Sequence, residues 1–362
     1  MFQGRLGLQQ RVLPSYRVPF FDLLSPACEG GLSLFAGQAR AGEHIAPGEL
    51  RSAQHTPARN VHLLRGPLYL CYQRGMLDWL AHWQPDALIV EANPRYLATP
   101  AAVNWMHRRM RPVIGWGLGA PPPAGPLARL WQGGWAGFLN RFDAMIAYSR
   151  RGAEEYAALG FPREKVFVAH NAVAPRPAAL PRRAPATVGR PGVLFVGRLQ
   201  ARKRVDSLLH ACAEMPDPKP RLTIVGDGPE RQNLELLAGQ VYPLAEFVGA
   251  KHGRELEPFY AKAELFVLPG TGGLAVHQAM AHALAVVVAK GDGTQEDLVR
   301  PGNGWLIQPE DHASLVSALR EALSDPGRLR QMGAESYRIV TQEINLEEMV
   351  GTFVRALNSF TY

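Results

Sequence analysis

Two cations near the middle of the chain, Arg198 and Lys203, have the spacing of a diphosphate-binding site. An apolar run ends in Gly197-Arg198, and Lys203 follows five residues later, just before a segment with helical periodicity. The amides at a helix N-terminus attract anions, and an arginine fork and a lysine ammonium would add two fixed charges beside them. In a transfer that releases a nucleoside diphosphate, the same charges would stabilise the leaving group. Arg202 and Arg204, which flank Lys203, have the simpler interpretation of solvated surface residues.

Glycine-rich turns follow the next apolar runs of the same half of the chain. Glycine has no Cβ, so the backbone at these turns can approach a ligand closely. Several such turns in order, at the spacing of strand–helix–strand units, indicate one continuous ligand site. The candidate binding residues in and around these turns are Gly197, Arg198, Lys203, Gly226, Gly228, Val248, Gly270, Thr271, Gly272, Gly273 and Leu274.

One carboxylate in the first half, Glu91, closes the apolar run 86–92. Because the chain turns directly afterwards, we expect Glu91 at the carboxyl end of a strand, facing a ligand and able to contact an acceptor hydroxyl. A helix cap or a structural ion pair is the alternative interpretation. His277 is expected to pack inside the protein and His107 to lie exposed on a helix.

The elements that must position these residues alternate between strand and helix in both halves of the chain. Before residue 174, the predicted strands are 86–92, 112–119, 144–149 and 165–173, and the helices are 99–110 and 150–160. After residue 191, the predicted strands are 192–199, 221–228, 245–250, 264–270 and 285–290, and the helices are 205–215, 229–240, 255–263, 274–284 and 346–359. The alternation predicts an α/β fold with two Rossmann-like, doubly wound domains that face each other across a cleft.

The length of 362 residues suits two domains. A proline- and arginine-rich linker, 175–191, separates an N-terminal domain at 1–174 from a C-terminal domain at 192–345. The tail, 346–362, is predicted to form a helix that packs back on the first domain.

The positive charge lies in the first half of the chain. Residues 1–175 carry 18 Lys and Arg against 11 Asp and Glu, whereas the remainder carries 21 of each kind. Such a field attracts anionic lipid or phosphorylated acceptors, with an arginine-rich solvated surface as the alternative. The basic residues are scattered and show no interleaved aromatic stacking pattern, so nucleic acid is not an expected partner.

The compartment is expected to be the cytoplasm, or the inner face of the cell membrane. The sequence has neither a membrane-spanning apolar run nor a secretory signal at its start. Cys28, Cys71 and Cys212 match no metal-ligand spacing and are expected to be reduced, so no metal or cofactor is expected.

A predicted helix in the first half of the chain has one aromatic face. Trp131, Trp135 and Phe138 recur at helical spacing, with Arg129 and Arg141 beside them. A core-packed helix is the simpler interpretation, and a peripheral contact with an anionic membrane is the other.

Residues 193–310 resemble the donor-binding domain of the GT-B retaining glycosyltransferases of family 4, the "glycosyl transferases group 1" set. The segments that carry the resemblance are VLFVGRLQARKRVDSLLHA, LTIVGDGPER, FVGAKHGRELEPFYAKAELFVLPG, GGLAVHQAMAHALAVVVA and NGWLIQPED, with a looser likeness over 147–173. The resemblance implies that a hexosyl group passes, with retention, from a nucleoside-diphosphate sugar to a saccharide or a polyprenyl-diphosphate-linked saccharide. It places this reaction in cell-surface polysaccharide or glycolipid biosynthesis.

The same resemblance assigns roles to particular residues. Arg198 and Lys203 would bind the donor diphosphate, whereas Arg11, Arg17 and Asn171 would contact the acceptor. Together with Glu91, the two donor cations are the candidate catalytic groups.

The sequence departs from the family at its double-glutamate motif. Gly270 and Gln278 stand where the family has two glutamates, so Gln278 would bind the nucleotide ribose without a charge and Gly270 offers no carboxylate. The histidine that many members carry near the reacting carbon is replaced by Leu118. These departures motivate an alternative, a non-catalytic nucleotide-sugar-binding partner or regulator. A nucleotide-sugar 2-epimerase is disfavoured, because the acidic and histidine groups that it needs are not found.

Overall fold

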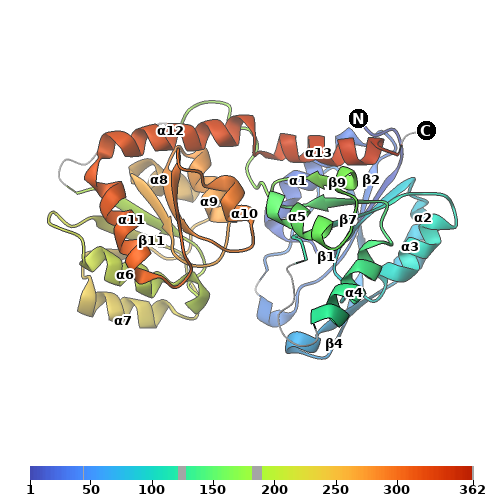
Figure 1. Cartoon of the computed structure of the whole chain (residues 1–362), viewed down its shortest axis with the longest axis horizontal. Helices are drawn as coiled ribbons and strands as arrows, with labels where there is room; N and C mark the ends of the chain where they lie inside the picture. The colour runs from blue at the N-terminus through green and yellow to red at the C-terminus, as the bar shows by residue number, and fades with distance from the viewer. Residues whose placement is uncertain (44, 121–127, 182–189, 361–362) are drawn as a thin grey trace. The chain divides into compact units, whose positions relative to one another are not determined.

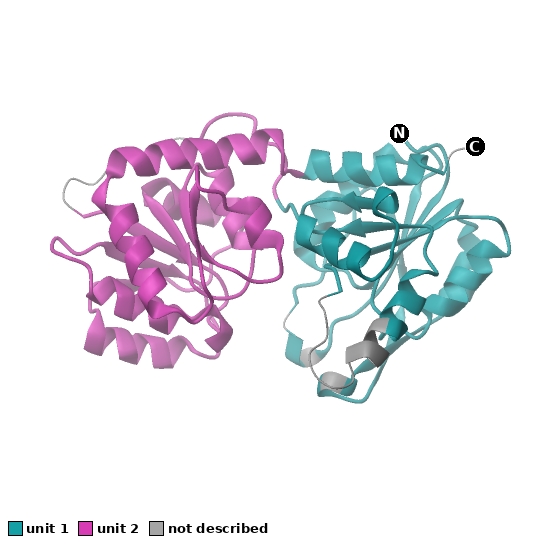
Figure 2. Ribbon diagram, in the orientation of Figure 1, with its two compact units in different colours: residues 1–173, 346–362 teal, residues 174–345 magenta. Residues whose placement is uncertain are grey.

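A computed structural model of the protein describes residues 1–43, 45–120, 128–181 and 190–360, without the side chains of Ala41, Pro67 and 128–132. Figure 1 shows the arrangement of its helices and strands. The chain divides into two compact units, coloured separately in Figure 2. Unit 1 comprises Met1–Val173 and Leu346–Tyr362, and unit 2 comprises Ala174–Asn345.

Unit 1 is built on a seven-stranded parallel sheet. In their order across the sheet the strands are β3 (Gln54–Pro57), β2 (Leu32–Gly37), β1 (Leu6–Val12), β6 (Ala87–Glu91), β7 (Val113–Gly117), β8 (Ala144–Ala147) and β9 (Val166–Val168). A separate antiparallel hairpin pairs β4 (Arg59–Leu63) with β5 (Leu70–Arg74) through the 3-10 turn η4 (Gly66–Leu68).

Helices cover both faces of this sheet. They are α1 (Val18–Leu24), α2 (Met76–Trp83), α3 (Thr99–His107), α4 (Ala128–Leu139), α5 (Arg150–Ala158) and α13 (Leu346–Asn358). Side chains of α2, α3, α4 and α5 share one buried apolar cluster with the sheet. Phe353 of α13 packs edge-on against Phe20 of α1 and against Trp116 of β7, and Phe20 contacts Trp116 with tilted rings. The C-terminal helix is therefore part of unit 1.

Unit 2 has a six-stranded parallel sheet. Its strands, in order across the sheet, are β12 (Ala245–Phe247), β11 (Arg221–Val225), β10 (Gly192–Val196), β13 (Leu265–Leu268), β14 (Ala285–Ala289) and β15 (Gly304–Ile307). Its helices are α6 (Val205–Ala213), α7 (Arg231–Val241), α8 (Glu257–Lys262), α9 (Leu274–Ala281), α10 (Thr294–Leu298), α11 (His312–Ser324) and α12 (Pro326–Gln342). Every residue of β10 and β14 is buried, as expected for parallel strands covered by helices on both faces.

Both sheets are doubly wound. In unit 2 the chain runs from β10 outward to β12 and then returns to place β13 on the other side of β10. In unit 1, β1 and β6 are the corresponding neighbours. The α/β class and the doubly wound topology predicted from the sequence are confirmed for each unit. In such sheets a ligand binds beyond the carboxyl ends of the two strands where the order reverses.

The structure adds strands before residue 86, where the sequence analysis placed none. In β1, Gln9 and Gln10 are almost fully buried and break the apolar pattern. Gln73 of β5 bonds to both residues: the Gln9 side chain donates to Gln73 Oε1 at 2.5 Å, and Gln73 donates to the Gln10 backbone carbonyl at 3.1 Å. The Gln10 side-chain Nε2 is buried without a hydrogen-bond partner among the described residues. Arg11 therefore lies within a strand and not in a loop.

Candidate functional site

In unit 2, the carboxyl ends of β10 and β13 bring together the two segments with the strongest sequence signal. Gly197-Arg198 directly follows β10, and Pro269–Leu274 follows β13 and leads into α9. These are the two strands at which the strand order reverses. The position is the one at which doubly wound sheets bind nucleotides and other phosphate-bearing ligands.

Lys203 is tied to the glycine-rich loop. It ends the 3-10 turn η6 (Ala201–Lys203), and its Nζ donates to the Thr271 carbonyl at 2.5 Å. Arg202 donates through Nη1 to Thr271 Oγ1 at 3.1 Å, and its carbonyl accepts from the Thr271 amide at 3.0 Å. Burial, followed by the neighbouring charge of Arg202, lowers the pKa of Lys203 to about 8. A bound anion would favour the charged form of this ammonium group.

Arg198 is half-buried and has no ion-pair or hydrogen-bond partner for its guanidinium among the residues that the structure describes. A guanidinium offers five N–H donors in a fixed fork that suits phosphate oxygens. The structure therefore supplies one cation with unused donors and one with a single carbonyl partner at the same strand ends.

Gly270 explains why one glutamate of the family motif is absent here. The residue is buried, and a Cβ at this position would overlap the backbone of Arg202 and Lys203. Turn η6 and the glycine-rich loop are thus in direct backbone contact, which we call the η6–loop contact. A glutamate side chain at position 270 would require this contact to open.

Gly226 and Gly228 allow a similar close approach to the segment between β10 and η6. Their φ angles are +148° and +158°, and the carbonyls of Gly197 and Leu199 occupy the space where Cβ atoms would lie. The Leu199 amide also donates to the Asp227 carbonyl at 2.9 Å. These two glycines, predicted to approach a ligand, also allow the loops after β10 and β11 to lie against each other.

The other predicted donor-binding residues lie nearby along the same strand ends. Gly273 is the N-cap of α9, Leu274 is its first residue, and the Gly272 carbonyl accepts from Gln295 Nε2 at 2.9 Å. Val248 follows β12, and its amide donates to the Ile224 carbonyl at 3.1 Å.

Two polar side chains of α9, Gln278 and His277, differ in how deeply they are buried. Gln278 is half-buried, and its Oε1 accepts only a long contact of 3.5 Å from the Tyr260 hydroxyl. His277 is fully buried, and its Nε2 lies 2.7 Å from the Ile344 carbonyl. Burial lowers the pKa of His277 to about 4, so it is a neutral packing residue, as the sequence predicted.

In unit 1, a hollow of about 710 Å³ opens at the carboxyl ends of β6, β7 and β8. Residues after these strands form one wall, and the β4–β5 hairpin forms another. The lining residues are Leu64, Leu68, Tyr69, Leu70, Glu91, Ala92, Asn93, Pro94, Arg95, Tyr96, Trp116, Gly117, Leu118, Gly119, Trp135 and Tyr148. Leu118, at the position of the family's histidine, is 48% exposed.

Glu91 sits in this hollow at the point where β1 and β6 adjoin. Its Oε2 accepts from the Arg11 backbone amide at 2.7 Å, and its own amide donates to Gln9 Oε1 at 3.0 Å. Burial raises the pKa of Glu91 to about 7, against the opposing effect of the Arg11 amide and charge. Close to neutral pH this carboxyl group can therefore exchange a proton.

The Arg11 guanidinium forms an ion pair within the protein and so is not available to bind an acceptor anion. It bonds Glu43 at 2.9 Å, and Glu43 also accepts from Arg40 at 2.9 Å. Although burial opposes ionisation of Glu43, the bonds from Arg11 and Arg40 lower its pKa to about 2. The charge of Arg11 is thus neutralised within the protein.

Arg17 and Asn171, both predicted to contact the acceptor, are in contact with each other. Arg17 Nη2 donates to Asn171 Oδ1 at 2.6 Å, and the guanidinium lies over the rings of Trp116 and Tyr148 at 5.3 and 5.2 Å. Only 4% of Arg17 is exposed. Since Trp116 and Tyr148 line the hollow, Arg17 supports its aromatic wall from behind.

The sequence analysis did not find the hairpin side of the hollow or Tyr96. The hairpin has no Asn-Gly or Asp-Gly turn, and nothing local relates residues 64–70 to residue 91. The aromatic segment gave a partial signal, because Trp135 lines the hollow and Phe138 joins the core. The side chain of Trp131 and residues 121–127 lie outside the described part.

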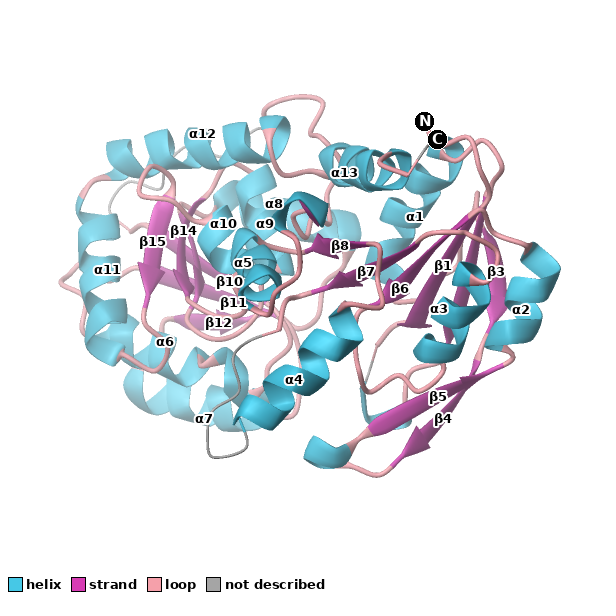
Figure 3. Ribbon diagram, turned by 45° about the vertical axis from the view of Figure 1, so that its right-hand side comes forward, coloured by secondary structure: helices cyan, strands magenta, loops and turns pink. Residues whose placement is uncertain are grey.

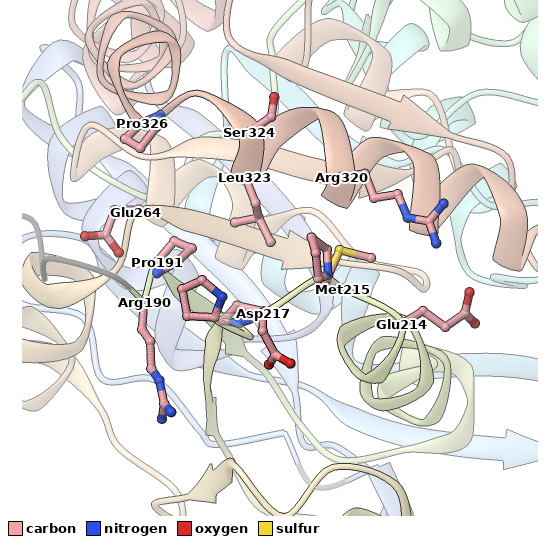
Figure 4. A pocket seen from close by; sticks show the side chains of 13 residues that line it. Arg190, Pro191, Glu214, Met215, Asp217, Glu264, Arg320, Leu323, Ser324 and Pro326 are labelled. Carbon is pink, nitrogen blue, oxygen red and sulfur yellow. The ribbon is translucent and has the colours of Figure 1, made fainter.

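A second hollow, of about 720 Å³, lies in unit 2 at the opposite edge of the sheet (Figure 4). Arg190, Pro220 and Glu264 in its lining immediately precede β10, β11 and β13 or come within two residues of them. It therefore adjoins the amino ends of the strands, away from the switch point and from Lys203. We do not assign the donor to it.

Two further observations bear on the class of protein. In the described ranges, no group of three or more His, Cys, Asp or Glu side chains is placed to hold a metal ion. None of the described helices combines the length and the apolar character needed to cross a bilayer.

Two family models match the chain in succession. Residues 27–172 match "Glycosyl transferase 4-like domain", and residues 180–339 match "Glycosyl transferases group 1". The two segments leave unmatched only the chain ends and a short stretch between them.

Individual relatives and structures agree with these models. A GDP-mannose-dependent alpha-mannosyltransferase of Mycobacterium tuberculosis is 36% identical over 186 residues, which are 48% of this chain and 47% of that protein. A lipopolysaccharide core biosynthesis glycosyltransferase of Rhizobium meliloti is 22% identical over 72% of this chain and 80% of its own. The matches to curated relatives at 32–36% identity span about a quarter to a half of those proteins' length.

Among solved structures, HepE of Anabaena in complex with UDP aligns over 99% of this chain and all of its own, with a TM-score of 0.73 and 18% identity. Sucrose-phosphate synthase from Thermosynechococcus elongatus aligns over the same shares, with a TM-score of 0.71 and 18% identity. Two successive family models, the relatives and the fold together establish that the chain belongs to the GT-B glycosyltransferases of the group 1, or family 4, type.

Proposed function

We propose that the protein is a retaining hexosyltransferase that uses a nucleoside-diphosphate sugar. The observation that carries the proposal is the pair Arg198 and Lys203 beside the glycine-rich loop at the strand-order reversal of unit 2. The names of relatives support the donor class, since one depends on GDP-mannose and a structure of the same fold contains UDP. The hexose and the base are left to experiment.

In the proposed reaction, the acceptor oxygen forms a bond to the anomeric carbon while the bond from that carbon to the diphosphate oxygen breaks. The acceptor hydroxyl proton passes to the departing phosphate on the same face of the sugar, so configuration is retained without an enzyme nucleophile. Arg198 and Lys203 neutralise the charge that develops on the diphosphate, a role for which no metal is required. Gly272 and Gly273 would offer backbone amides to the sugar or the β-phosphate, whereas the Thr271 amide, also a sequence candidate, is bonded to the Arg202 carbonyl.

The acceptor is proposed to be a saccharide or a polyprenyl-diphosphate-linked saccharide, bound in the hollow of unit 1. The half-buried ring of Tyr148 in the lining suits the apolar face of a sugar ring, and Glu91 is placed to bond an acceptor hydroxyl. The relative in lipopolysaccharide core biosynthesis supports a role in cell-surface polysaccharide or glycolipid assembly. Such a role would place the protein in the cytoplasm at the inner face of the cell membrane.

A panel of UDP- and GDP-sugars tests the proposal, first by thermal shift of the full chain and then by transfer to lipid-linked and free saccharides. A donor that binds only the folded protein raises its melting temperature. Arg198→Ala and Lys203→Ala should remove the shift. If both variants keep the full shift, the donor site has been misplaced.

A second candidate function is a nucleotide-sugar-binding partner without activity of its own. The observation that favours it is Gly270, where backbone packing excludes the glutamate of the family. Donor binding with no transfer and no donor hydrolysis, over the whole acceptor panel, would select this alternative.

A further inference from the structure

The β4–β5 hairpin of unit 1 has an exposed apolar tip. Leu64 is 62% exposed and Leu68 is 70% exposed, and Leu63 and Tyr72 are 41% and 44% exposed. These four residues, which we call the hairpin tip, lie within one short hairpin. Clustered exposed apolar side chains of this kind usually mark a contact surface.

Leucine is unfavourable at position 64 because the backbone is left-handed there and because the apolar side chain is exposed. Its φ is +59°, in the left-handed region that a leucine enters at a cost of about 1–2 kcal/mol and that glycine or asparagine adopts readily. Its side chain gains little packing within the unit, because most of it is exposed. Folding alone does not account for leucine at this position, whereas an external apolar contact does.

The charged residues within the hairpin sequence are of one sign. Residues 50–77 contain four arginines and no Asp or Glu. Arg59 lies directly opposite Arg74 at the end of the hairpin away from the tip, on the same face as Leu63 and Tyr72 because side chains alternate along a strand. This like-charge pairing destabilises a two-stranded ribbon. Neither they nor Arg65 has an ion pair with a carboxylate among the described residues. An anionic surface would relieve this repulsion.

Hydrogen bonds near both ends of the hairpin hold it in place, so the tip is fixed and not a loose loop. Near the base, Asn60 Nδ2 donates to the Arg11 carbonyl at 2.8 Å, and near the turn the Cys71 amide donates to the Arg95 carbonyl at 3.0 Å. Figure 3 shows β4 and β5 as a ribbon separate from the main sheet of unit 1. Leu64 and Leu68 also line the hollow that contains Glu91, so the apolar surface continues into that hollow.

We infer that the hairpin tip is the membrane-contacting element of this protein. Leu63, Leu64, Leu68 and Tyr72 insert into the headgroup region of an anionic bilayer, and the unpaired arginines bind its lipid phosphates. A lipid-borne acceptor thereby reaches the Glu91 hollow while its apolar chains stay in the bilayer. This last step rests on the proposed function, whereas the membrane contact itself does not.

Vesicle flotation of the full chain tests the inference, with phosphatidylcholine vesicles that contain or lack phosphatidylglycerol. We expect binding to the anionic vesicles, weakened by added salt. Arg59→Gln with Arg74→Gln should lower the partition coefficient about 30-fold, at about fivefold for each basic residue near the surface. Leu64→Ser with Leu68→Ser should lower it at least about tenfold.

Matched substitutions in unit 2 provide the controls. Leu236→Ser with Leu244→Ser changes two exposed leucines, and Arg254→Gln with Arg330→Gln changes two exposed arginines. Both control proteins should bind as the wild type does. Leu64→Asn is the further variant that separates binding from folding, because asparagine suits a φ of +59°: its melting temperature should hold or rise while vesicle binding falls.

The inference is overturned if the wild type does not bind anionic vesicles, or if the hairpin variants bind as well as the wild type does. Equal losses in the control pairs would also overturn it, since they would indicate a non-specific charge effect. Donor binding without vesicle binding would refute this inference alone. Vesicle binding without any nucleotide-sugar binding would refute the proposed function and leave the membrane contact standing.

Discussion

Lys203 allows the proposed donor site to be tested through its pH dependence. Its half-buried ammonium group has a pKa near 8 in the ligand-free protein, and its bond to the Thr271 carbonyl brings no negative formal charge. A diphosphate ester binds best to the protonated lysine, and it has no group of its own that titrates between pH 7 and pH 9. Donor affinity should therefore fall as the pH rises through about 8.

The size of the effect follows from the fraction of Lys203 that is charged. With a pKa of about 8, the ratio of total to protonated lysine is about 1.1 at pH 7 and about 11 at pH 9. The dissociation constant of the wild type for its donor should thus rise about tenfold over this range. Lys203→Arg keeps its charge throughout and should show a nearly flat profile, since a guanidinium does not titrate there.

Isothermal titration calorimetry at pH 7, 8 and 9, with whichever nucleotide sugar gives the largest thermal shift, measures the profile. Lys203→Met should bind about 10- to 100-fold more weakly at pH 7, the range for a lost charged hydrogen bond, and should also lose the pH dependence. A flat wild-type profile, or the same tenfold rise in Lys203→Arg, would show that the lysine does not contact the diphosphate.

Three further substitutions test the packing around the two sites. Gly270→Ala should lower the free energy of unfolding by about 1–3 kcal/mol, because the new Cβ overlaps the backbone of η6. The control Gly239→Ala in α7 meets no neighbour and should stabilise the protein slightly. Denaturant titration compares the two variants, and an unchanged midpoint for Gly270→Ala would contradict the packing. The raised pKa of Glu91 means that the folded state holds a proton which the unfolded state has released between about pH 4.5 and 7, so stability falls as the pH rises through this window. Glu91→Gln should therefore gain on the order of 1–2 kcal/mol relative to the wild type between pH 5 and pH 8, and parallel unfolding curves would refute this. Arg17→Met should cost about 2–4 kcal/mol and shift the tryptophan fluorescence of the aromatic wall, because Asn171 Oδ1 loses its donor; an unchanged midpoint and spectrum would show that Arg17 does not support the wall.

The strands of unit 2 could be predicted from the sequence because helices cover both faces of its sheet. β10 and β14 are continuous apolar runs, and the glycines after them mark where each strand ends. The same logic failed for β1, where Gln9 and Gln10 are buried and Gln73 bonds to the Gln9 side chain and to the Gln10 backbone carbonyl. That compensation joins residues more than 60 positions apart, so a local pattern could not reveal it.

The candidate sites follow the same division. Arg198, Lys203 and the glycine turns were found because a strand end, a charge and a helix start lie close together in the sequence. The sequence predicted that Glu91 lies at a strand end but not that it bonds to the Arg11 amide. That bond depends on the pairing of β1 with β6, which a local pattern does not show. The hairpin tip was not predicted because Leu64 adopts a left-handed backbone conformation, and glycine or asparagine is the residue that normally marks such a turn in a sequence.

The η6–loop contact has a consequence for attempts to redesign the donor preference. The Gly270 backbone lies against that of Arg202 and Lys203, and Thr271 is bonded to both of these residues. We therefore expect residues 201–203 and 270–273 to move as one rigid unit. A loop grafted from a relative that carries glutamate at position 270 would push the lysine away from its place. In the proposed donor site, a graft intended to change the sugar preference while keeping the diphosphate contacts must therefore exchange both segments at once.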